Sequence, residues 1–240
     1  MKEIDMKIIK DVRIKIDEEE VLRYQGYHRN KAEKTNEIIL QITREKIEQG
    51  YYLFEPKVIY FKLMVKKITS KGRISLENGF SLDFSNLIIN LLKGSSYLVL
   101  GVVTIGSSLE NKVSEFFSQG EYCRALALDA VGTVAVENLS RYVRNLVCQE
   151  AKDRNFLTTR HFSPGYNEWD ISQQKNIFQI IPADKIGVKL TESYMMIPKK
   201  SLSWAMGAGE NIITPYKEES HSCKACQAEN CQFRKTFEAL

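Results

Sequence analysis

Apolar residues recur at the spacing of one helical face in several parts of the chain. Residues 30–49 carry four isoleucines at near-helical spacing, and Gly50 is expected to end this amphipathic helix. Residues 121–152 are rich in Ala and Leu and predict a long central packing helix. A short helix is expected over 87–92, and Asp-Ile-Ser-Gln at 170–173 resembles a capping box that opens a further helix.

Other stretches carry the signals of strands. Residues 57–69 are rich in Val, Ile, Tyr and Phe, and residues 73–77 run into Asn78-Gly79, the strongest short signal of a hairpin. Residues 97–104 are continuously apolar, which predicts a buried strand. The alternation of apolar and charged residues at 12–16 favours one more strand. Together these patterns indicate a small antiparallel meander.

A second hairpin is expected near the end of the chain. Residues 188–196 and 201–205 have strand character on either side of Pro198. Helical and strand patterns are interspersed along the sequence, so the periodicity supports a mixed α and β class. We expect one body over residues 1–210 and a polar, cysteine-rich tail over 211–240.

Composition narrows the classes of function. The 240 residues are 43% hydrophobic and 27% charged, as in a globular body with a sizeable core. The net charge of +4 is too small for the basic footprint of a nucleic-acid-binding protein, so no nucleic-acid partner is expected. The longest apolar stretch, 97–103, is far shorter than the ~20 residues of a membrane span. The N-terminus has no secretory signal, and we therefore expect a cytoplasmic protein with no membrane partner.

The tail brings His221, Cys223, Cys226 and Cys231 close together in sequence. A Cys-x-x-Cys spacing lets two thiolates bind one ion, and the third cysteine or the histidine completes three or four ligands. Three thiolates and one imidazole suit a structural zinc site, whereas three thiolates with a fourth ligand from elsewhere suit an iron-sulfur cluster. The alternative is a set of free thiols.

The segment from Arg160 to Tyr166, Arg-His-Phe-Ser-Pro-Gly-Tyr, has the chemistry of a ligand cradle. Pro164 presets φ for the first central position of a turn, and Gly165 accepts a positive φ, so backbone groups can approach a ligand closely. Arg160 can offer its guanidinium to a carboxylate, and Tyr166 can stack on an aromatic ring. On local composition alone, a simple turn between two elements is the more economical interpretation.

This loop and residues 187–203 together resemble the activation domain of cobalamin-dependent methionine synthase. The second segment contains Lys-Leu-Thr-Glu-Ser-Tyr, then a Pro turn and a Ser-rich strand. The pieces Thr-Ile-Gly at 104–106 and Asp-Ala-Val-Gly at 129–132 extend the resemblance over most of the body. The resemblance implies an α+β fold, with helices packed on a curved, mainly antiparallel sheet. It also implies that the ligand is S-adenosylmethionine.

The resemblance places the ligand site on both segments. The family has an Arg three residues before the Pro, where this chain has His161. Either a one-residue bulge brings Arg160 to the ligand carboxylate, or His161 makes that contact. Glu168 or Glu192 would face the sulfonium, and strand alternation would put Glu192 and Tyr194 on one face. The implied binding residues are Arg160, His161, Ser163, Pro164, Gly165, Tyr166, Glu192 and Tyr194.

Cobalamin modules carry an Asp-x-His-x-x-Gly motif whose histidine approaches the cobalt, and no histidine of this chain stands in that context. The resemblance therefore implies a stand-alone activation subunit. It would bind S-adenosylmethionine and support reductive remethylation of cob(II)alamin on a corrinoid protein, such as a methionine synthase that lacks its own activation domain. Flavodoxin or ferredoxin is the expected electron donor. The alternatives rest on the tail: a zinc-binding interaction module, or an iron-sulfur redox adaptor for a corrinoid methyltransferase.

Overall fold

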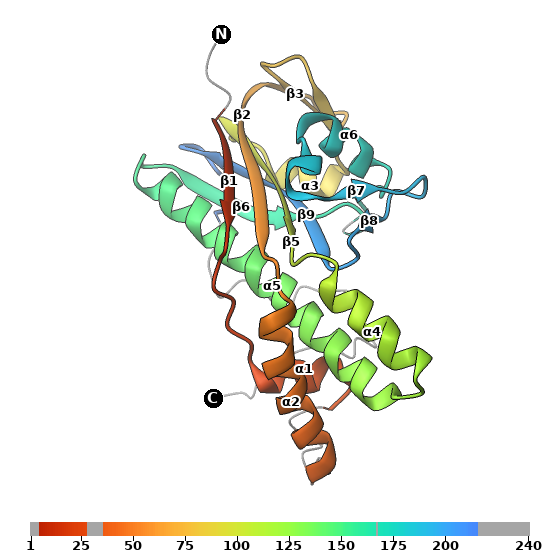
Figure 1. The fold of residues 1–240 in the computed structure, drawn as a ribbon. Helices are drawn as coiled ribbons and strands as arrows, with labels where there is room; N and C mark the ends of the chain where they lie inside the picture. The colour runs from red at the N-terminus through yellow and green to blue at the C-terminus, as the bar shows by residue number, and fades with distance from the viewer. Residues whose placement is uncertain (1–4, 28–35, 167, 216–240) are drawn as a thin grey trace.

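A curved antiparallel sheet forms the upper half of the molecule as drawn in Figure 1. The structure is a computed structural model and describes residues 5–27, 36–166 and 168–215. In spatial order the main strands are β4 (Ser81–Asp83), β3 (Arg73–Leu76), β2 (Lys57–Ile68), β5 (Tyr97–Thr104), β9 (Ser201–Gly209) and β6 (Leu157–Phe162). A further strand, β1 (Asp5–Lys10), pairs with the first half of β2.

Strand β2 shows why this sheet needs cover on both faces. Val58 and Tyr60 pack into one hydrophobic cluster, whereas Ile59 packs into another. This alternation is the two-residue period of a strand. The second half of β2 pairs with β3, and the register shifts between Val65 and Lys67. Irregularities of this kind bend a strand, which contributes to the curvature of the sheet.

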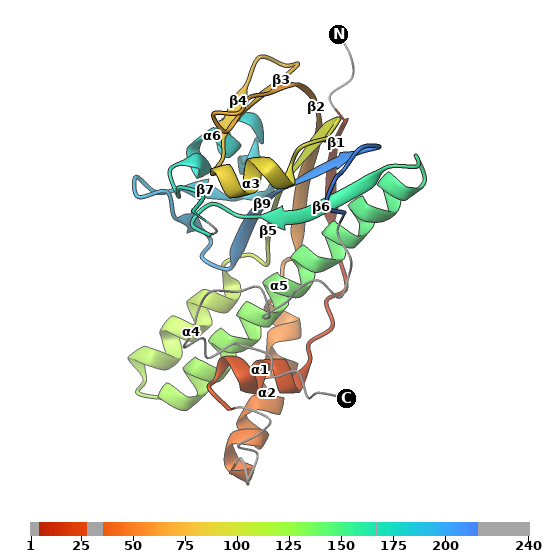
Figure 2. The same cartoon turned by 180° about the vertical axis from the view of Figure 1, so that it is seen from behind.

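Helices cover the two faces unequally (Figures 1 and 2). The covering elements of one face are α3 (Asn86–Leu91), α6 (Gln173–Ile180) and the 3-10 helix η2 (Ala183–Ile186). The other face lies against the long helix α5 (Tyr122–Lys152), which continues beyond the sheet. Around its first half pack α1 (Glu18–Tyr24), α2 (Glu37–Leu53) and α4 (Ser108–Ser118). Of the helices described, none combines the length and apolarity needed to cross a bilayer.

The α+β fold with a mainly antiparallel sheet is confirmed. The expected strands at 57–69 and 97–104 and the helix at 121–152 occur within one or two residues of their predicted bounds. Asn78-Gly79 forms the turn between β3 and β4, with Gly79 at φ +91°. The loop is of the three-residue type, because the Gly79 amide donates to the Leu76 carbonyl at 3.1 Å and the Leu76 amide donates to the Phe80 carbonyl at 2.9 Å. Such a loop places a glycine in the left-handed conformation at its third residue, here Gly79.

Two predictions at helix ends are wrong. Helix α2 continues through Gly50 to Leu53, and the predicted start at residue 30 lies outside the described residues. A Cβ on Gly50 would lie 2.7 Å from Cγ1 of Val131, so the glycine marks the crossing of α2 over α5 and not a helix end. Helix α6 begins only at Gln173. Asp170 Oδ1 accepts from the Ser172 amide at 2.8 Å, as the predicted cap would, but the Gln173 side chain accepts from the Asp83 amide at 3.2 Å instead of completing a capping box.

The second predicted hairpin is also wrong. Only the short strands β7 (Lys189–Leu190) and β8 (Met196–Ile197) pair with each other, while β9 lies between β5 and β6 in the main sheet. The residues between β7 and β8 form a turn, in which the Thr191 amide donates to the Met195 carbonyl at 2.8 Å. Residues 12–16 form no strand.

One carboxylate ties α5 to the sheet. Glu150 accepts hydrogen bonds from Lys7 Nζ at 2.6 Å and from the Tyr60 hydroxyl at 3.0 Å, and it forms an ion pair with the almost buried Lys62. Burial opposes ionisation of Glu150, but the bonds from Lys62, Lys7 and Tyr60 outweigh it and lower the pKa below its ordinary value of 4.5. The ionised form is therefore the one that the folded protein stabilises.

We predict that Glu150→Gln lowers the free energy of unfolding by about 1–3 kcal/mol at pH 7. The ionised carboxylate stabilises the fold above pH 4.5, and this contribution is lost as the pH falls through the lowered pKa. The difference between variant and wild type should therefore shrink in urea unfolding series taken down to pH 3. Glu48→Gln, at an exposed position of α2, is the control and should stay within about 0.5 kcal/mol. A loss for Glu150→Gln that is equal at every pH would contradict the assignment.

Candidate ligand-binding site

The candidate site begins at the end of edge strand β6. Thr158 is paired with Ala208, but His161 is paired with Met206, so β6 holds one more residue than β9 across this interval. This is the geometry of a one-residue bulge, the first of the two alternatives for Arg160. The Arg160 side chain is exposed, with its guanidinium carbon 5.3 Å from the centre of the buried Phe162 ring. His161 is partly buried.

A tight turn follows β6. The Tyr166 amide donates to the Ser163 carbonyl at 3.1 Å, which puts Pro164 and Gly165 at the two central positions. Gly165 has φ +89°, the conformation that a type II turn requires at its second central residue. Pro164 is buried, whereas the Tyr166 side chain is 69% exposed. Pro164 and Gly165 thus occupy the two central turn positions that the sequence predicts for them.

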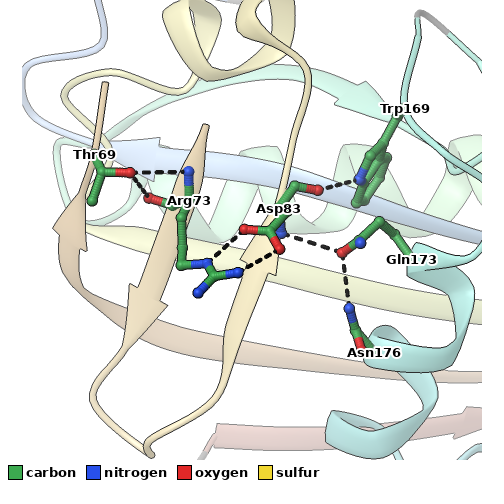
Figure 3. Close-up of polar contacts among 6 residues, drawn as sticks. All are labelled: Thr69, Arg73, Asp83, Trp169, Gln173 and Asn176. Atoms are coloured by element: carbon green, nitrogen blue, oxygen red, sulfur yellow. Dashed lines mark hydrogen bonds and ion pairs between the residues drawn. The ribbon is translucent and has the colours of Figure 1, made fainter. Parts of the chain in front are cut away.

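Trp169 anchors this turn to the sheet (Figure 3). Its carbonyl accepts a hydrogen bond from the Gly165 amide at 2.7 Å, and its indole nitrogen donates to the Asp83 carbonyl of β4 at 2.7 Å. The ring is buried and stacks on Phe84, with ring centres 4.5 Å apart. The buried Trp169 indole is therefore fixed to the sheet, and the Trp169 carbonyl in turn binds the loop at Gly165.

Asp83 extends the same network to β3 and α6. Its carboxylate receives two hydrogen bonds from the Arg73 guanidinium, at 2.6 and 2.8 Å, and these bonds lower the pKa of Asp83. Its amide donates to Gln173, which also accepts from Asn176 at 3.0 Å (Figure 3). Sequence reasoning did not identify Trp169 or Asp83 as supports. The available signal was a lone tryptophan between a glycine turn and a helix.

Glu192 and Tyr194 lie in the turn between β7 and β8 and not on a strand. The predicted alternation of faces is therefore wrong. Tyr194 has φ +63° and is partly buried, while Glu192 is exposed. The turn is closed by Thr191, whose Oγ1 accepts from the Met195 amide at 3.0 Å and lies 3.0 Å from Ser193 Oγ. Glu168, also at positive φ, is exposed.

The loop and the β7–β8 hairpin rest on one hydrophobic cluster. Trp169 and Phe162 belong to it on the loop side, and Val188 and the partly buried Met196 belong to it on the hairpin side. The two predicted binding segments are thus seated on the same face of the sheet.

The predicted metal ligands His221, Cys223, Cys226 and Cys231 lie outside the described residues. Within residues 5–27, 36–166 and 168–215, no group of three or more His, Cys, Asp or Glu side chains is placed to hold a metal ion.

Comparison with known proteins gives the family. Residues 81–213, more than half of the chain, match the family model described as "Vitamin B12 dependent methionine synthase, activation domain". The chain belongs to this family. The matched span contains the loop, Trp169 and the β7–β8 hairpin, so the resemblance drawn from the sequence motifs is confirmed.

A solved activation domain shares the fold. The crystal structure of the MetH reactivation domain bound to AdoHcy matches with a TM-score of 0.64 and 14% identity, over 90% of this chain and 81% of that chain. No curated protein matches this chain by sequence.

We predict that Trp169→Phe lowers the free energy of unfolding by about 1–3 kcal/mol more than Trp204→Phe. Both substitutions remove the same volume from a buried indole. Only the first breaks a hydrogen bond, because Trp204 Nε1 is buried and donates to no acceptor among the described residues. Urea unfolding of the two variants makes the comparison, and equal losses would contradict an anchoring role for the Trp169 hydrogen bond.

Proposed function

We propose that this chain is a stand-alone activation subunit that binds S-adenosylmethionine and supports reductive remethylation of cob(II)alamin on a partner corrinoid protein. The partner we propose is a methionine synthase that lacks its own activation domain. The observation that carries the proposal is the family match, because it spans the loop and the hairpin on which all the proposed ligand contacts lie.

The exposed groups of these segments fit the parts of S-adenosylmethionine. The exposed guanidinium of Arg160 suits the α-carboxylate, and the bulge in β6 supports Arg160 over His161 for this contact. The exposed ring of Tyr166 suits the adenine, and Gly165 leaves its backbone open to the ligand. Glu192 offers an exposed carboxylate to the sulfonium. Ser163 and Pro164 shape the turn, and Tyr194 flanks Glu192.

This chain contributes binding and orientation to the reaction. Cobalamin supplies the redox and methyl-transfer chemistry, and none of these 240 residues stands in the Asp-x-His-x-x-Gly context that cobalamin modules use. We propose that the cobalamin is held by a separate protein and that flavodoxin or ferredoxin reduces it. The loop and hairpin would then hold the methyl group in line and keep water away from it. No general base is required.

A second candidate function rests on the four residues of the tail. Three cysteines and a histidine within eleven positions favour a zinc or iron-sulfur site, which would make the chain an interaction or redox module for a corrinoid methyltransferase. Metal analysis and the visible absorption spectrum of anaerobically purified protein separate the two metals. A metal site without affinity for S-adenosylmethionine would favour this second function.

We predict that calorimetric titration detects S-adenosylmethionine binding to anaerobically purified protein, alone or with a cob(II)alamin-loaded partner. Gly165→Val should abolish it, because the backbone at φ +89° disfavours any side chain and the new one would approach Ile171. Gly120→Val is the matched control, at φ +78° between α4 and α5 with open space around its Cβ, and should leave the affinity unchanged.

Arg160→Ala and His161→Ala distinguish the two possible carboxylate contacts. With the bulge in β6, Arg160→Ala should weaken binding by at least about tenfold, the loss expected for a charge-assisted hydrogen bond. His161→Ala should weaken S-adenosylmethionine binding less than Arg160→Ala does. Absence of binding to the wild-type protein, with and without the partner, would overturn the proposed function.

A further inference from the structure

Lys200 connects the β7–β8 hairpin to the helical half of the molecule. It lies between the hairpin and β9, and its side chain is only 14% exposed. The ammonium is 2.9 Å from Oδ1 of Asp129 and donates to Oγ1 of Thr133 at 2.8 Å. Both partners belong to α5. A single side chain thus ties the segment that leaves the hairpin, residues 198–200 (the leg), to α5.

Backbone hydrogen bonds hold the same leg at two further points. The Lys199 amide donates to the Glu110 carboxylate of α4 at 2.7 Å. The Lys200 carbonyl accepts from the Ile105 amide at 3.2 Å, at the end of β5. Because these contacts come from three elements, the leg has little freedom to move relative to α4 and α5.

The surface of α5 is shaped to let the Lys200 side chain pass. A Cβ on Gly132 would lie 3.2 Å from Cε of Lys200 and 2.6 Å from Cδ2 of Leu109. A glycine inside a helix costs about 1 kcal/mol relative to alanine. The glycine that interrupts the apolar pattern of α5 is therefore accounted for by the close approach of Lys200 and Leu109.

The position of the leg also determines the position of the turn that carries Glu192 and Tyr194. Its internal hydrogen bonds, from the Tyr194 amide to the Thr191 carbonyl and from the Met195 amide to Thr191 Oγ1, make the turn a rigid unit. Pro198 is buried, and its carbonyl accepts from Ser201 Oγ at 2.7 Å. A shift of the leg at 199–200 would therefore move the whole turn.

The pair joins a nearly buried ammonium to a carboxylate that is 49% exposed, and such a pair contributes little stability by itself. Removing an ammonium from water is costly, and apolar side chains of similar volume often stabilise a fold as well or better. What fixes the geometry is that the Lys200 ammonium bonds both Asp129 and Thr133, one turn apart on α5.

We propose that Lys200 is a positioning residue, which fixes residues 191–199 against α4 and α5 and thereby places Glu192 and Tyr194 for the ligand. The inference rests on the proposed function, since it assumes that S-adenosylmethionine binds beside this hairpin.

The test compares Lys200→Met with Lys62→Met. Lys62 is a matched control, because its side chain is 13% exposed and it too pairs with a carboxylate of α5, at Glu150, but from β2. We expect the dissociation constant for S-adenosylmethionine to rise about tenfold in Lys200→Met and to stay within about twofold of wild type in Lys62→Met. Urea unfolding should show losses of similar size in both variants.

Two further readouts separate positioning from a general loss of stability. In a double-mutant cycle, Asp129→Asn should add little to the effect of Lys200→Met on the dissociation constant, because the two residues act through one pair. Hydrogen exchange at the Tyr194 and Met195 amides should be faster in Lys200→Met and unchanged in Lys62→Met.

Unchanged affinity in Lys200→Met, or equal weakening in Lys62→Met, would overturn the positioning role and leave the proposed function in place. If the wild type binds no S-adenosylmethionine with or without the corrinoid partner, the proposed function fails and the positioning role fails with it. The wild-type titration thus tells the two failures apart.

Discussion

The length and packing of helix α5 dictate where the sheet and the other helices lie. With 31 residues it is about 46 Å long, more than the sheet can cover. Its second half therefore packs beneath β5, β9 and β6, while its first half needs α1, α2 and α4 to bury its remaining apolar side chains. Glycines permit close approaches to this helix at two points: Gly50 where α2 crosses it, and Gly132 where Lys200 and Leu109 meet it.

Both segments of the proposed site are turns whose positions are fixed by residues that pack or bond beneath them. The loop after β6 depends on Trp169, which stacks on Phe84 and bonds to the backbone of β4. The hairpin depends on Lys200 and on the bond between the Lys199 amide and α4. Neither support is expected to touch the ligand. A site that would bind its ligand through backbone groups and a few exposed side chains needs such supports, because each turn alone makes too few contacts to fix the turn's own position.

The same arrangement fits the proposed role of serving a partner's cofactor. Arg160, Tyr166 and Glu192 are exposed, so their groups are available to a ligand at the surface. The buried side chains behind them belong to the core cluster of one sheet face. Rigid turns on a packed core are suited to orienting a reacting group, and the chemistry itself can then be supplied by the protein that carries the cobalamin.

Elements whose cause is local could be predicted from the sequence alone. Asn78-Gly79 and Pro164-Gly165 form their turns because of their own backbone preferences. The β-branched and aromatic residues of β2, the continuous apolar run of β5 and the Ala- and Leu-rich run of α5 each indicate their element. The family motifs of the loop and hairpin were also readable. That β9 joins the main sheet and not the hairpin, and that Gly50 lies inside a helix, was settled by the packing. The deciding contacts, with β5 and β6 and with Val131, come from distant parts of the chain, and local periodicity carries no information about such partners. The turn that contains Glu192 is closed by hydrogen bonds of Thr191 with Tyr194 and Met195, which an alternating strand pattern does not reveal.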